Sequence, residues 1–360
     1  MKKILSAMTM FLVLTASSSW AVGFETFDTG LTGLKPAVEG NLIAYSSQLD
    51  CGNYCYPSRI EGTLSYYDMN SGENVDTGFP TYCAPTIEKN TIAFIAMENQ
   101  LNRDLNGDGD IRYGVGKLFT YNALNGEFHE TEGLTDECPA PSIAKGEIVY
   151  GASEKSIIGD LNGDGIVSGN YLQGLYDVSS DTVSYLPDIA AGEVATMDRD
   201  HVVYLDFRAE TDVDGNGVVD YRDNYRPTVY DKRTGETVAI NVRTSDYPTV
   251  DNHVMSFMGY NPSISGYELY YYDIDGGTLV NTGIRGMGSS ARSTAISNGR
   301  ILFFDLDKTL NLYDIATGTV TYTGVPTISG PMWPSPFALD GDIGVYETVN
   351  KTIGIIKFGK

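Results

Sequence analysis

The sequence predicts an all-β fold, a seven-bladed β-propeller whose blades are four-stranded antiparallel sheets. Three observations support this prediction. The chain holds 40 Gly and 25 Tyr with many Thr and Val, a composition typical of short strands joined by tight turns. A two-strand pattern recurs seven times, and the last repeat lacks a strand that the N-terminal segment can supply. No window of helical length has sustained apolar spacing of three and four residues.

The repeat sets the number of blades. Thirteen-residue segments align without gaps, each with a small or apolar fourth residue, polar turn residues and then an apolar run. Each segment therefore predicts a strand, a tight turn and a second strand. The segments begin near residues 35, 84, 140, 194, 247, 293 and 335, at Lys35, Ala84, Ala140, Val194, Tyr247, Ser293 and Ser335.

A second half-repeat follows each of the first six segments. Examples are residues 64–78, 118–133, 269–283 and 310–324, of which the last three have Asn-Gly, Gly-Gly and Thr-Gly near the centre. These pairs predict hairpins, because Gly accepts a positive φ without steric cost. The two half-repeats form a four-stranded meander, and radial stacking lets each sheet cover its neighbour.

The seventh blade predicts how the ring closes. After its thirteen-residue segment, only residues 352–358 supply a further strand. Residues 24–30 match the strand endings at 76–78 and 281–283 of other blades. We therefore expect the N-terminal strand to join the last blade and close the ring, which an open solenoid would not require.

The repeat form resembles that of WD-repeat-like and TolB-type periplasmic propellers over nearly the whole chain after residue 21. The Trp-Asp dipeptide is absent. The resemblance implies the fold and no particular active site.

The N-terminus has the layout of a secretory signal peptide. Lys2 and Lys3 precede an apolar run over residues 4–16, and a small-x-small cleavage site ends at Ala21. The apolar run is short for a transmembrane span, which leaves a retained anchor as the alternative. We expect a secreted or periplasmic protein without membrane insertion, with a signal peptide over 1–21 and one propeller domain over 22–360.

The chain is strongly acidic, with a formal net charge of −23 at pH 7. Such a surface repels nucleic acid phosphates and attracts cations, so we expect no nucleic acid partner. Plain solubility is the simpler explanation for most of these charges. We expect a monomer.

Four cysteines in an exported chain predict two disulfides. Cys51 and Cys55 are close enough in sequence to form one pair. Cys83 and Cys138 precede the first strands of adjacent blades, so the Cys83–Cys138 pair would join those blades. Zinc binding by four thiolates is the alternative, although the paired C-x-x-C spacing is missing.

Three consecutive blades carry an insertion between the second and third strands that resembles the front half of an EF-hand loop. Side-chain oxygens recur at loop positions 1, 3 and 5, and Gly stands at position 6. This spacing predicts up to three Ca²⁺ ions. The predicted ligands are Asp104, Asn106, Asp108 and Asp110 in the first loop, Asp160, Asn162, Asp164 and Ile166 in the second, and Asp212, Asp214, Asn216, Val218, Asp220 and Asp223 in the third.

The first two loops lack the acid that normally closes an EF-hand site at position 12. Glu98, Glu154 and Asp206 stand six residues before the first Asp of each loop. We expect Glu98 and Glu154 to supply the missing carboxylates, with ordinary surface acids as the alternative. The loops also resemble those of dockerins and integrin-type propellers, but a strand follows each loop here, so cohesin docking is not implied.

The sequence offers no clear catalytic constellation. His129 falls in a predicted outer strand, while His201 and His253 fall at the first turns of adjacent blades, opposite the calcium loops. A catalytic pair and solvent-facing turn residues are both possible there. Polysaccharide lyases with seven-bladed propellers carry a metal-binding His cluster for which we find no counterpart in the sequence.

Three functional hypotheses remain, and the first is preferred. The protein is a calcium-stabilised module that binds a protein or glycan. The alternative is a glycan-active enzyme, a lyase or hydrolase, with acids and Tyr near the propeller axis. The third is a structural envelope role. Acids and Tyr converging in a deep axial pocket would favour the enzyme, and a flat, loop-rimmed face would favour binding.

Overall fold

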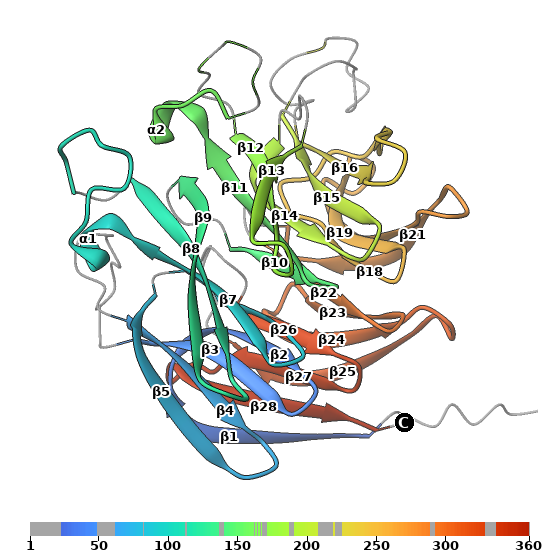
Figure 1. Cartoon of the computed structure of the whole chain (residues 1–360). Coiled ribbons are helices and arrows are strands. Elements are labelled where there is room, and N and C mark those ends of the chain that lie inside the picture. Colours follow the sequence, from blue (N-terminus) through green and yellow to red (C-terminus); the bar gives the residue numbers. More distant parts are fainter. Residues whose placement is uncertain are drawn as a thin grey trace, which may run out of the picture.

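The computed structural model describes residues 23–48, 62–81, 83–111, 114–136, 140–161, 163, 165, 167, 171–186, 191–207, 219, 225–288, 292–327 and 336–359. Seven four-stranded antiparallel blades surround a central axis (Figure 1), which confirms the predicted fold class. Two four-residue helices, α1 (Glu98–Leu101) and α2 (Glu154–Ile157), complete the described elements. Within this part of the chain, no helix has the length and apolar content needed to cross a membrane.

Each blade uses four strands in order from the axis outward. Blade 1 is β2 (Leu34–Glu39), β3 (Leu42–Gln48), β4 (Gly62–Asp68) and β5 (Glu73–Pro80). Blade 2 is β6 (Thr86–Glu88), β7 (Thr91–Met97), β8 (Val115–Asn122) and β9 (Glu127–Asp136). Blade 3 is β10 (Ser142–Ala144), β11 (Glu147–Ser153), β12 (Tyr171–Asp177) and β13 (Thr182–Tyr185).

The remaining blades follow the same order. Blade 4 is β14 (Ala191–Met197), β15 (His201–Asp206), β16 (Arg226–Asp231) and β17 (Thr237–Ala239). Blade 5 is β18 (Thr249–Asp251), β19 (Val254–Asn261), β20 (Gly266–Asp273) and β21 (Thr278–Gly286). Blade 6 is β22 (Thr294–Ser297), β23 (Arg300–Phe304), β24 (Thr309–Asp314) and β25 (Thr319–Pro326). Blade 7 is β26 (Phe337–Asp340), β27 (Ile343–Glu347) and β28 (Thr352–Phe358), with β1 (Phe24–Thr32) outermost.

The two ends of the chain close the ring as predicted. Strand β1 pairs antiparallel with β28, in a register that places Phe24 opposite Phe358 and Phe27 opposite Ile355. The last blade is therefore built from both ends of the chain. Its core is continuous with that of blade 1, because Val345 packs in one buried cluster with Ile43.

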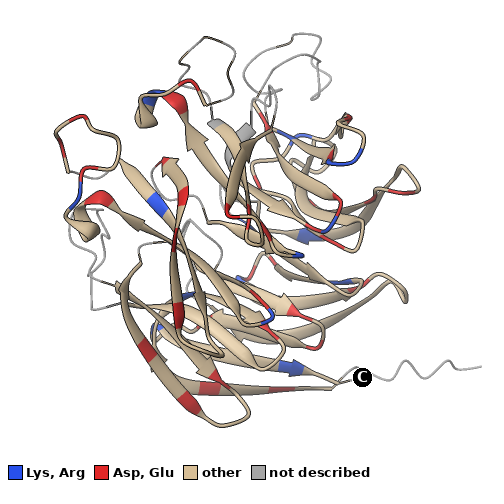
Figure 2. Ribbon diagram, viewed as in Figure 1, with Lys and Arg blue, Asp and Glu red and all other residues tan. Residues whose placement is uncertain are grey.

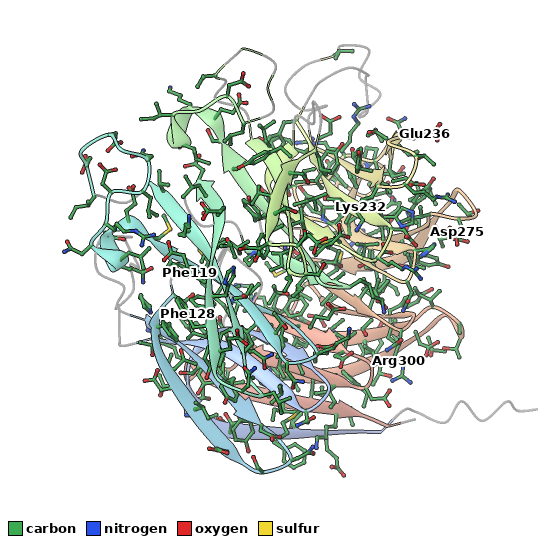
Figure 3. All side chains as sticks on the ribbon, in the orientation of Figure 1. Phe119, Phe128, Lys232, Glu236, Asp275 and Arg300 are labelled. Atoms are coloured by element: carbon green, nitrogen blue, oxygen red, sulfur yellow. The ribbon has the colours of Figure 1, made fainter. Side chains whose placement is uncertain are left out.

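The core lies between neighbouring blades. The second strands are buried on both faces, because each blade is covered by its two neighbours; six of the seven residues of β7 are buried. The outer strands instead alternate exposed and half-buried residues, as in β21. Aromatic side chains extend the packing outward, where Phe119 and Phe128 stack with ring centroids 5.2 Å apart (Figure 3).

The meander gives the propeller two distinct faces. We define the turn face by the turns that join the first strand of each blade to its second. We define the loop face by the opposite ends of the same strands, where the chain enters each blade and where α1 and α2 begin. In Figure 1, α1 and α2 lie in neighbouring blades, and each follows the second strand of its blade.

Candidate functional site

The first predicted calcium loop folds around its acidic residues. Asp104 accepts hydrogen bonds from the N–H groups of Gly107 (2.7 Å) and Gly109 (2.9 Å). Asp108 accepts one from the N–H of Asp110 (2.7 Å), and the Asn106 amide donates to the other Asp108 oxygen (3.1 Å). Gly109 has φ +83°, a conformation that favours glycine. The loop therefore gathers its oxygens in one tight turn.

Glu98 turns toward this loop from the first position of α1. Its side chain is 2% exposed, and its Oε1 accepts hydrogen bonds from the N–H groups of Leu105 (2.6 Å) and Asn106 (3.4 Å). Burial raises the pKa of Glu98; the two N–H groups oppose this rise, and the charges of Asp108 and Asp104 add to it. Within the described residues, no Lys or Arg forms an ion pair with Glu98. The ordinary-surface-acid alternative does not fit this geometry.

The second loop repeats the arrangement one blade later. Glu154 is fully buried at the start of α2, and its Oε1 accepts a hydrogen bond from the N–H of Leu161 (3.0 Å). Asp160 accepts hydrogen bonds from the N–H groups of Gly163 (2.7 Å) and Gly165 (2.8 Å). Acidic residues therefore lie on α1, on the loop after it and on α2 (Figure 2).

Several predicted ligands lie outside the described residues. In the second loop these are Asn162, Asp164 and Ile166, and in the third loop they are Asp212, Asp214, Asn216, Val218, Asp220 and Asp223. The upstream acid of the third loop, Asp206, is described and buried, and an Asp206 oxygen lies 3.8 Å from the Arg226 guanidinium. Unlike Glu98, it has a cationic neighbour.

The first loop also contacts the next blade. The Asn106 side-chain amide donates a hydrogen bond to the Ser156 carbonyl of α2 at 2.8 Å. Blades 2 and 3 are thereby joined through the residue at loop position 3. Among the predicted disulfide cysteines, only Cys83 is described, and it is fully buried. Both pairings remain predictions, since Cys51, Cys55 and Cys138 lie outside the described residues.

Beyond the loops, the first strands of all seven blades line an axial cavity of about 740 Å³. The acids at its turn-face end bind the next blade rather than one another. Glu88 accepts hydrogen bonds from the N–H groups of Lys145 (2.6 Å) and Gly146 (2.9 Å). The acid before the first turn does likewise in other blades, where Asp198 accepts from the backbone N–H of His253, Asp251 from that of Asn298 and Asp340 from that of Gly40.

Glu39 is the exception at this repeat position. Its Oε2 is buried without a hydrogen-bond partner in the described structure. Burial raises the pKa of Glu39 to about 7, and the negative charges of Glu88 and Asp340 contribute to the rise. Residues 39 and 88 carry the same side chain in adjacent blades, yet only Glu88 is neutralised by backbone amides.

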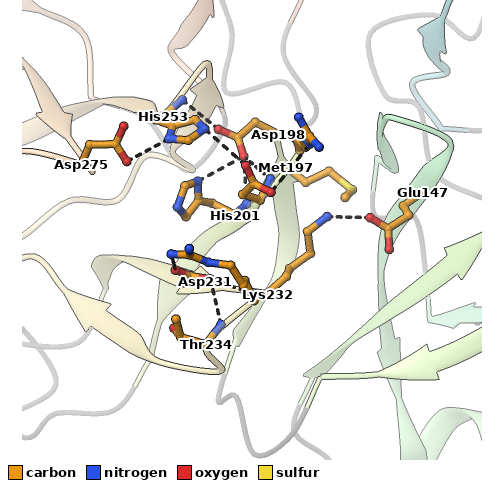
Figure 4. A network of polar contacts seen from close by, with 12 residues as sticks. Glu147, Met197, Asp198, His201, Asp231, Lys232, Thr234, His253 and Asp275 are labelled. Atoms are coloured by element: carbon orange, nitrogen blue, oxygen red, sulfur yellow. Dashed lines mark hydrogen bonds and ion pairs between the residues drawn. The ribbon is translucent and has the colours of Figure 1, made fainter.

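The two turn histidines meet on the turn face. His201 is 5% exposed, so it is not a solvent-facing turn residue, and its ring lies edge-on to that of His253 with centroids 4.9 Å apart. Asp198 accepts hydrogen bonds from the backbone N–H groups of His201 (2.8 Å) and His253 (2.9 Å) (Figure 4). A hydrogen bond with Asp275 raises the pKa of His253 despite partial burial. His129, in blade 2, lies apart and pairs with Asp181 at 3.0 Å.

The loop face holds a buried ionic group that sequence reasoning missed. Asp246 is fully buried and accepts hydrogen bonds from the N–H groups of Met258 (2.9 Å) and Ser293. Burial raises the pKa of Asp246 to about 8, against the lowering effects of these bonds and of the Arg292 charge. Arg292 donates to the Ala195 carbonyl at 3.1 Å, so it links blade 6 to blade 4.

Comparisons with known proteins place the chain by its fold. No protein-family model matches the sequence, and no curated protein matches it. The propeller domain of the trilobed protease from Pyrococcus furiosus is similar at TM-score 0.59 and 14% identity, over 92% of this chain and 96% of that one. Oligogalacturonate lyase from Vibrio parahaemolyticus is similar at TM-score 0.55 and 9% identity, over 94% and 97%.

TolB from Acinetobacter baumannii is also similar, at 13% identity over 82% of this chain and 59% of that one. Its TM-score of 0.41 is too low to support an argument. The chain is therefore a propeller module similar to peptidase propeller domains and to a lyase propeller. At these identities the likeness concerns the fold alone. The Pyrococcus furiosus domain is described as having an open velcro topology, whereas β1 closes the ring here.

Proposed function

We propose that this chain is an exported, calcium-binding β-propeller that serves as a binding module for a protein or glycan ligand. The observation that carries the proposal is the position of Glu98. A buried carboxylate directed at an acidic loop, with no cationic partner among the described residues, is costly unless a cation neutralises the group.

Calcium suits the donor set better than other ions. The first loop offers the oxygens of Asp104, Asn106 and Asp108, the backbone carbonyl of Asp110, and the carboxylate of Glu98. Ca²⁺ accepts six to eight oxygen ligands in a flexible cage, whereas Mg²⁺ demands a stricter octahedron. Asp160 and Glu154 would act in the second loop, and the third loop would use its own six predicted ligands. The ion would neutralise the acids and hold the loop against α2.

The axial cavity supports binding over catalysis. A glycan-active enzyme would need free carboxylates beside aromatic platforms. Here Glu88 and Asp251 are engaged by backbone amides of the next blade, and no Tyr is among the described residues that line the cavity. Tyr270 and Tyr272 are instead buried in the core between blades. The joining of blades therefore accounts for Glu88 and Asp251, while Glu39 is the acid of this cavity whose Oε2 has no hydrogen-bond partner in the described structure.

Localisation and assembly remain part of the proposal. The predicted signal peptide over 1–21 and the even number of cysteines support export to an oxidising compartment. An extracellular or periplasmic setting would also supply calcium at the concentrations that such loops require. We propose that the mature chain, residues 22–360, acts as one propeller domain and as a monomer.

The experiment is a binding screen of the mature chain with and without calcium. Glycan arrays and protein pull-downs would be run in calcium and in EGTA, with the wild type, Glu98→Gln and the exposed-acid control Glu25→Gln. We expect calcium-dependent retention of one ligand class by the wild type and by Glu25→Gln, and weaker retention by Glu98→Gln.

Two outcomes would contradict the proposal. Equal retention in calcium and EGTA by all three proteins would separate ligand binding from the loops. Release of unsaturated or reducing sugar from a polysaccharide, without stable retention, would favour the glycan-active enzyme.

A further inference from the structure

Asp198, His201 and His253 form a compact group on the turn face, away from the calcium loops. Asp198 and His201 belong to blade 4, and His253 lies in the turn between β18 and β19 of blade 5. Each residue offers a nitrogen or oxygen atom, and these atoms lie within 4.8 Å of one another. Asp198 and His201 are buried, so the group is fixed by the fold rather than gathered at a mobile surface.

The two imidazoles meet their carboxylates in different ways. The Nδ1 of His201 lies 3.2 Å from Asp198 Oδ1, a separation that two ligands of one zinc ion can have. The Nδ1 of His253 lies 2.9 Å from an oxygen of Asp275, which is outside the group. A carboxylate that holds one nitrogen of a histidine fixes its tautomer and directs the other nitrogen toward a ligand. This is the arrangement that outer carboxylates give to metal-binding histidines.

Oxygen donors complete the group. The Nε2 of His253 lies 3.4 Å from Asp200 Oδ2, close to the separation of about 3.4 Å between two ligands of a tetrahedral zinc bonded at about 2.1 Å. Asp198 Oδ2 accepts a hydrogen bond from the backbone N–H of His253, and a carboxylate oxygen has a second lone pair.

The surrounding charge favours a cation. Asp198, Asp200 and Asp275 bring three carboxylates to the two imidazoles. The nearby Lys232 is occupied elsewhere, since its Nζ lies 2.7 Å from a Glu147 oxygen (Figure 4). Arg199 is largely exposed, and its Nε lies 3.9 Å from an Asp200 oxygen.

We propose that His201, His253 and Asp198 bind one Zn²⁺ ion at the turn-face rim of the axial cavity, with Asp200 as a nearby oxygen donor and Asp275 orienting His253. Two imidazoles and a carboxylate suit zinc, whereas calcium prefers an all-oxygen cage. Asp198, Asp200 and His253 also line the axial cavity, so the ion would be reached from it. The site is independent of the calcium loops, which lie on the other face.

The test is a zinc titration of the mature chain by calorimetry, after metal removal and with calcium in large excess. We expect one equivalent of Zn²⁺ to bind the wild type. His201→Ala and His253→Ala should each weaken binding by at least about 100-fold, and Asp275→Asn by about 10–100-fold, the range for outer partners of metal-bound histidines. His129→Ala removes the histidine outside the group and should bind like the wild type.

Cobalt absorption and a folding check keep the test decisive. Co²⁺ should give the intense visible bands of a four-coordinate site in the wild type and lose them in His253→Ala. Each variant is first checked by near-ultraviolet circular dichroism in EDTA. If the buried His201 variant fails to fold, the partly exposed His253 and the exposed Asp275 variants decide.

Wild-type affinity in His253→Ala, or several weak zinc equivalents lost equally in all variants, would overturn the proposal. Loss of calcium binding elsewhere would not affect this result, because calcium is saturating and the ligands are separate.

Discussion

Two parts of the loop face neutralise buried carboxylates in different ways. Between blades 5 and 6, Asp246 receives two backbone N–H groups and lies in the field of Arg292, so the protein supplies its own counter-charge. In blade 2, Glu98 receives N–H groups but faces Asp104 and Asp108, so its charged neighbours repel it. Asp246 therefore has a cation among its charged neighbours, whereas Glu98 has only acids, and we propose calcium as its counter-charge.

The largest expected effect is on stability and tests Asp246, the buried carboxylate with a cation among its neighbours. Asp246→Ala leaves two buried N–H groups without their acceptor and removes the negative charge near Arg292, so it should lower the free energy of unfolding by about 3–5 kcal/mol. Urea unfolding in calcium and in EGTA should give the same loss. Asp307→Ala, an exposed acid in the β23–β24 turn, is the control and should change stability by less than about 0.5 kcal/mol. If Asp246→Ala lost less than about 1 kcal/mol, the claim that the surrounding protein groups stabilise Asp246 would be contradicted.

The next effect is also on stability and tests Glu98, for which we propose calcium as the counter-charge. At roughly millimolar calcium and a dissociation constant near 0.1 mM, each bound ion should stabilise the fold by about 1.4 kcal/mol. Glu98→Gln should therefore be less stable than the wild type in calcium. In EGTA it should be equally or more stable, because the substitution removes a buried charge that Asp104 and Asp108 repel. Glu25→Gln should show neither change, and the same sign for Glu98→Gln in both buffers would contradict a cation at this residue.

The smallest expected effect is a pH dependence of stability on the turn face. There Glu39 and Glu88 are the same residue type in adjacent blades but differ in their hydrogen-bond partners. The pKa of Glu39 is about 7 in the fold and near 4.5 when unfolded. Folded protein therefore holds a proton that unfolded protein has lost between these values, so this group's contribution to stability falls as the pH rises from about 4.5 to 7. After discounting for solvent screening, Glu39→Gln should stabilise the protein by about 1 kcal/mol at pH 8 and change little at pH 4.5.

Glu88→Gln is the matched control for this pH dependence. It weakens the acceptor of the Lys145 and Gly146 N–H groups, so it should destabilise the protein at pH 8. Urea unfolding at both pH values measures the two variants together. Stabilisation by both, or by neither, would show that the carboxylates at this position are equivalent.

The repeat made the fold predictable, but partners between blades required the structure. Ring closure followed from the missing strand near Ile355 and its match at Phe27, because strand number and turn residues are local signals. The loop spacing singled out Glu98, which is buried with its Oε1 on the Leu105 N–H, and its role as a calcium ligand stays a prediction. By contrast, Glu39 and Glu88 look alike in sequence, and their difference depends on the backbone of the next blade. Asp246 and Arg292 each directly precede a thirteen-residue segment, at Tyr247 and Ser293, so the repeat gives them equivalent positions in adjacent blades. The burial of Asp246, and the backbone groups that the two residues bond, required the structure.

The histidine pair could be predicted from the sequence only in part. His201 and His253 fall at the first turns of adjacent blades, from which the sequence left a catalytic pair and solvent-facing turn residues both open. Their burial and their carboxylates depended on the turn conformation, in which Asp198 accepts N–H groups from both blades. A repeat position predicts neighbours around a ring, whereas side-chain direction depends on local backbone geometry.

The central claim is that the inserted loops bind calcium through the acids that precede them. Calcium titration by calorimetry of the metal-free mature chain tests it most directly, with the wild type, Glu98→Gln, the double variant Glu98→Gln and Glu154→Gln, and Glu25→Gln compared. We predict saturable binding by the wild type and Glu25→Gln, one site fewer for Glu98→Gln and two fewer for the double variant. Unchanged stoichiometry and affinity in the double variant would contradict the claim.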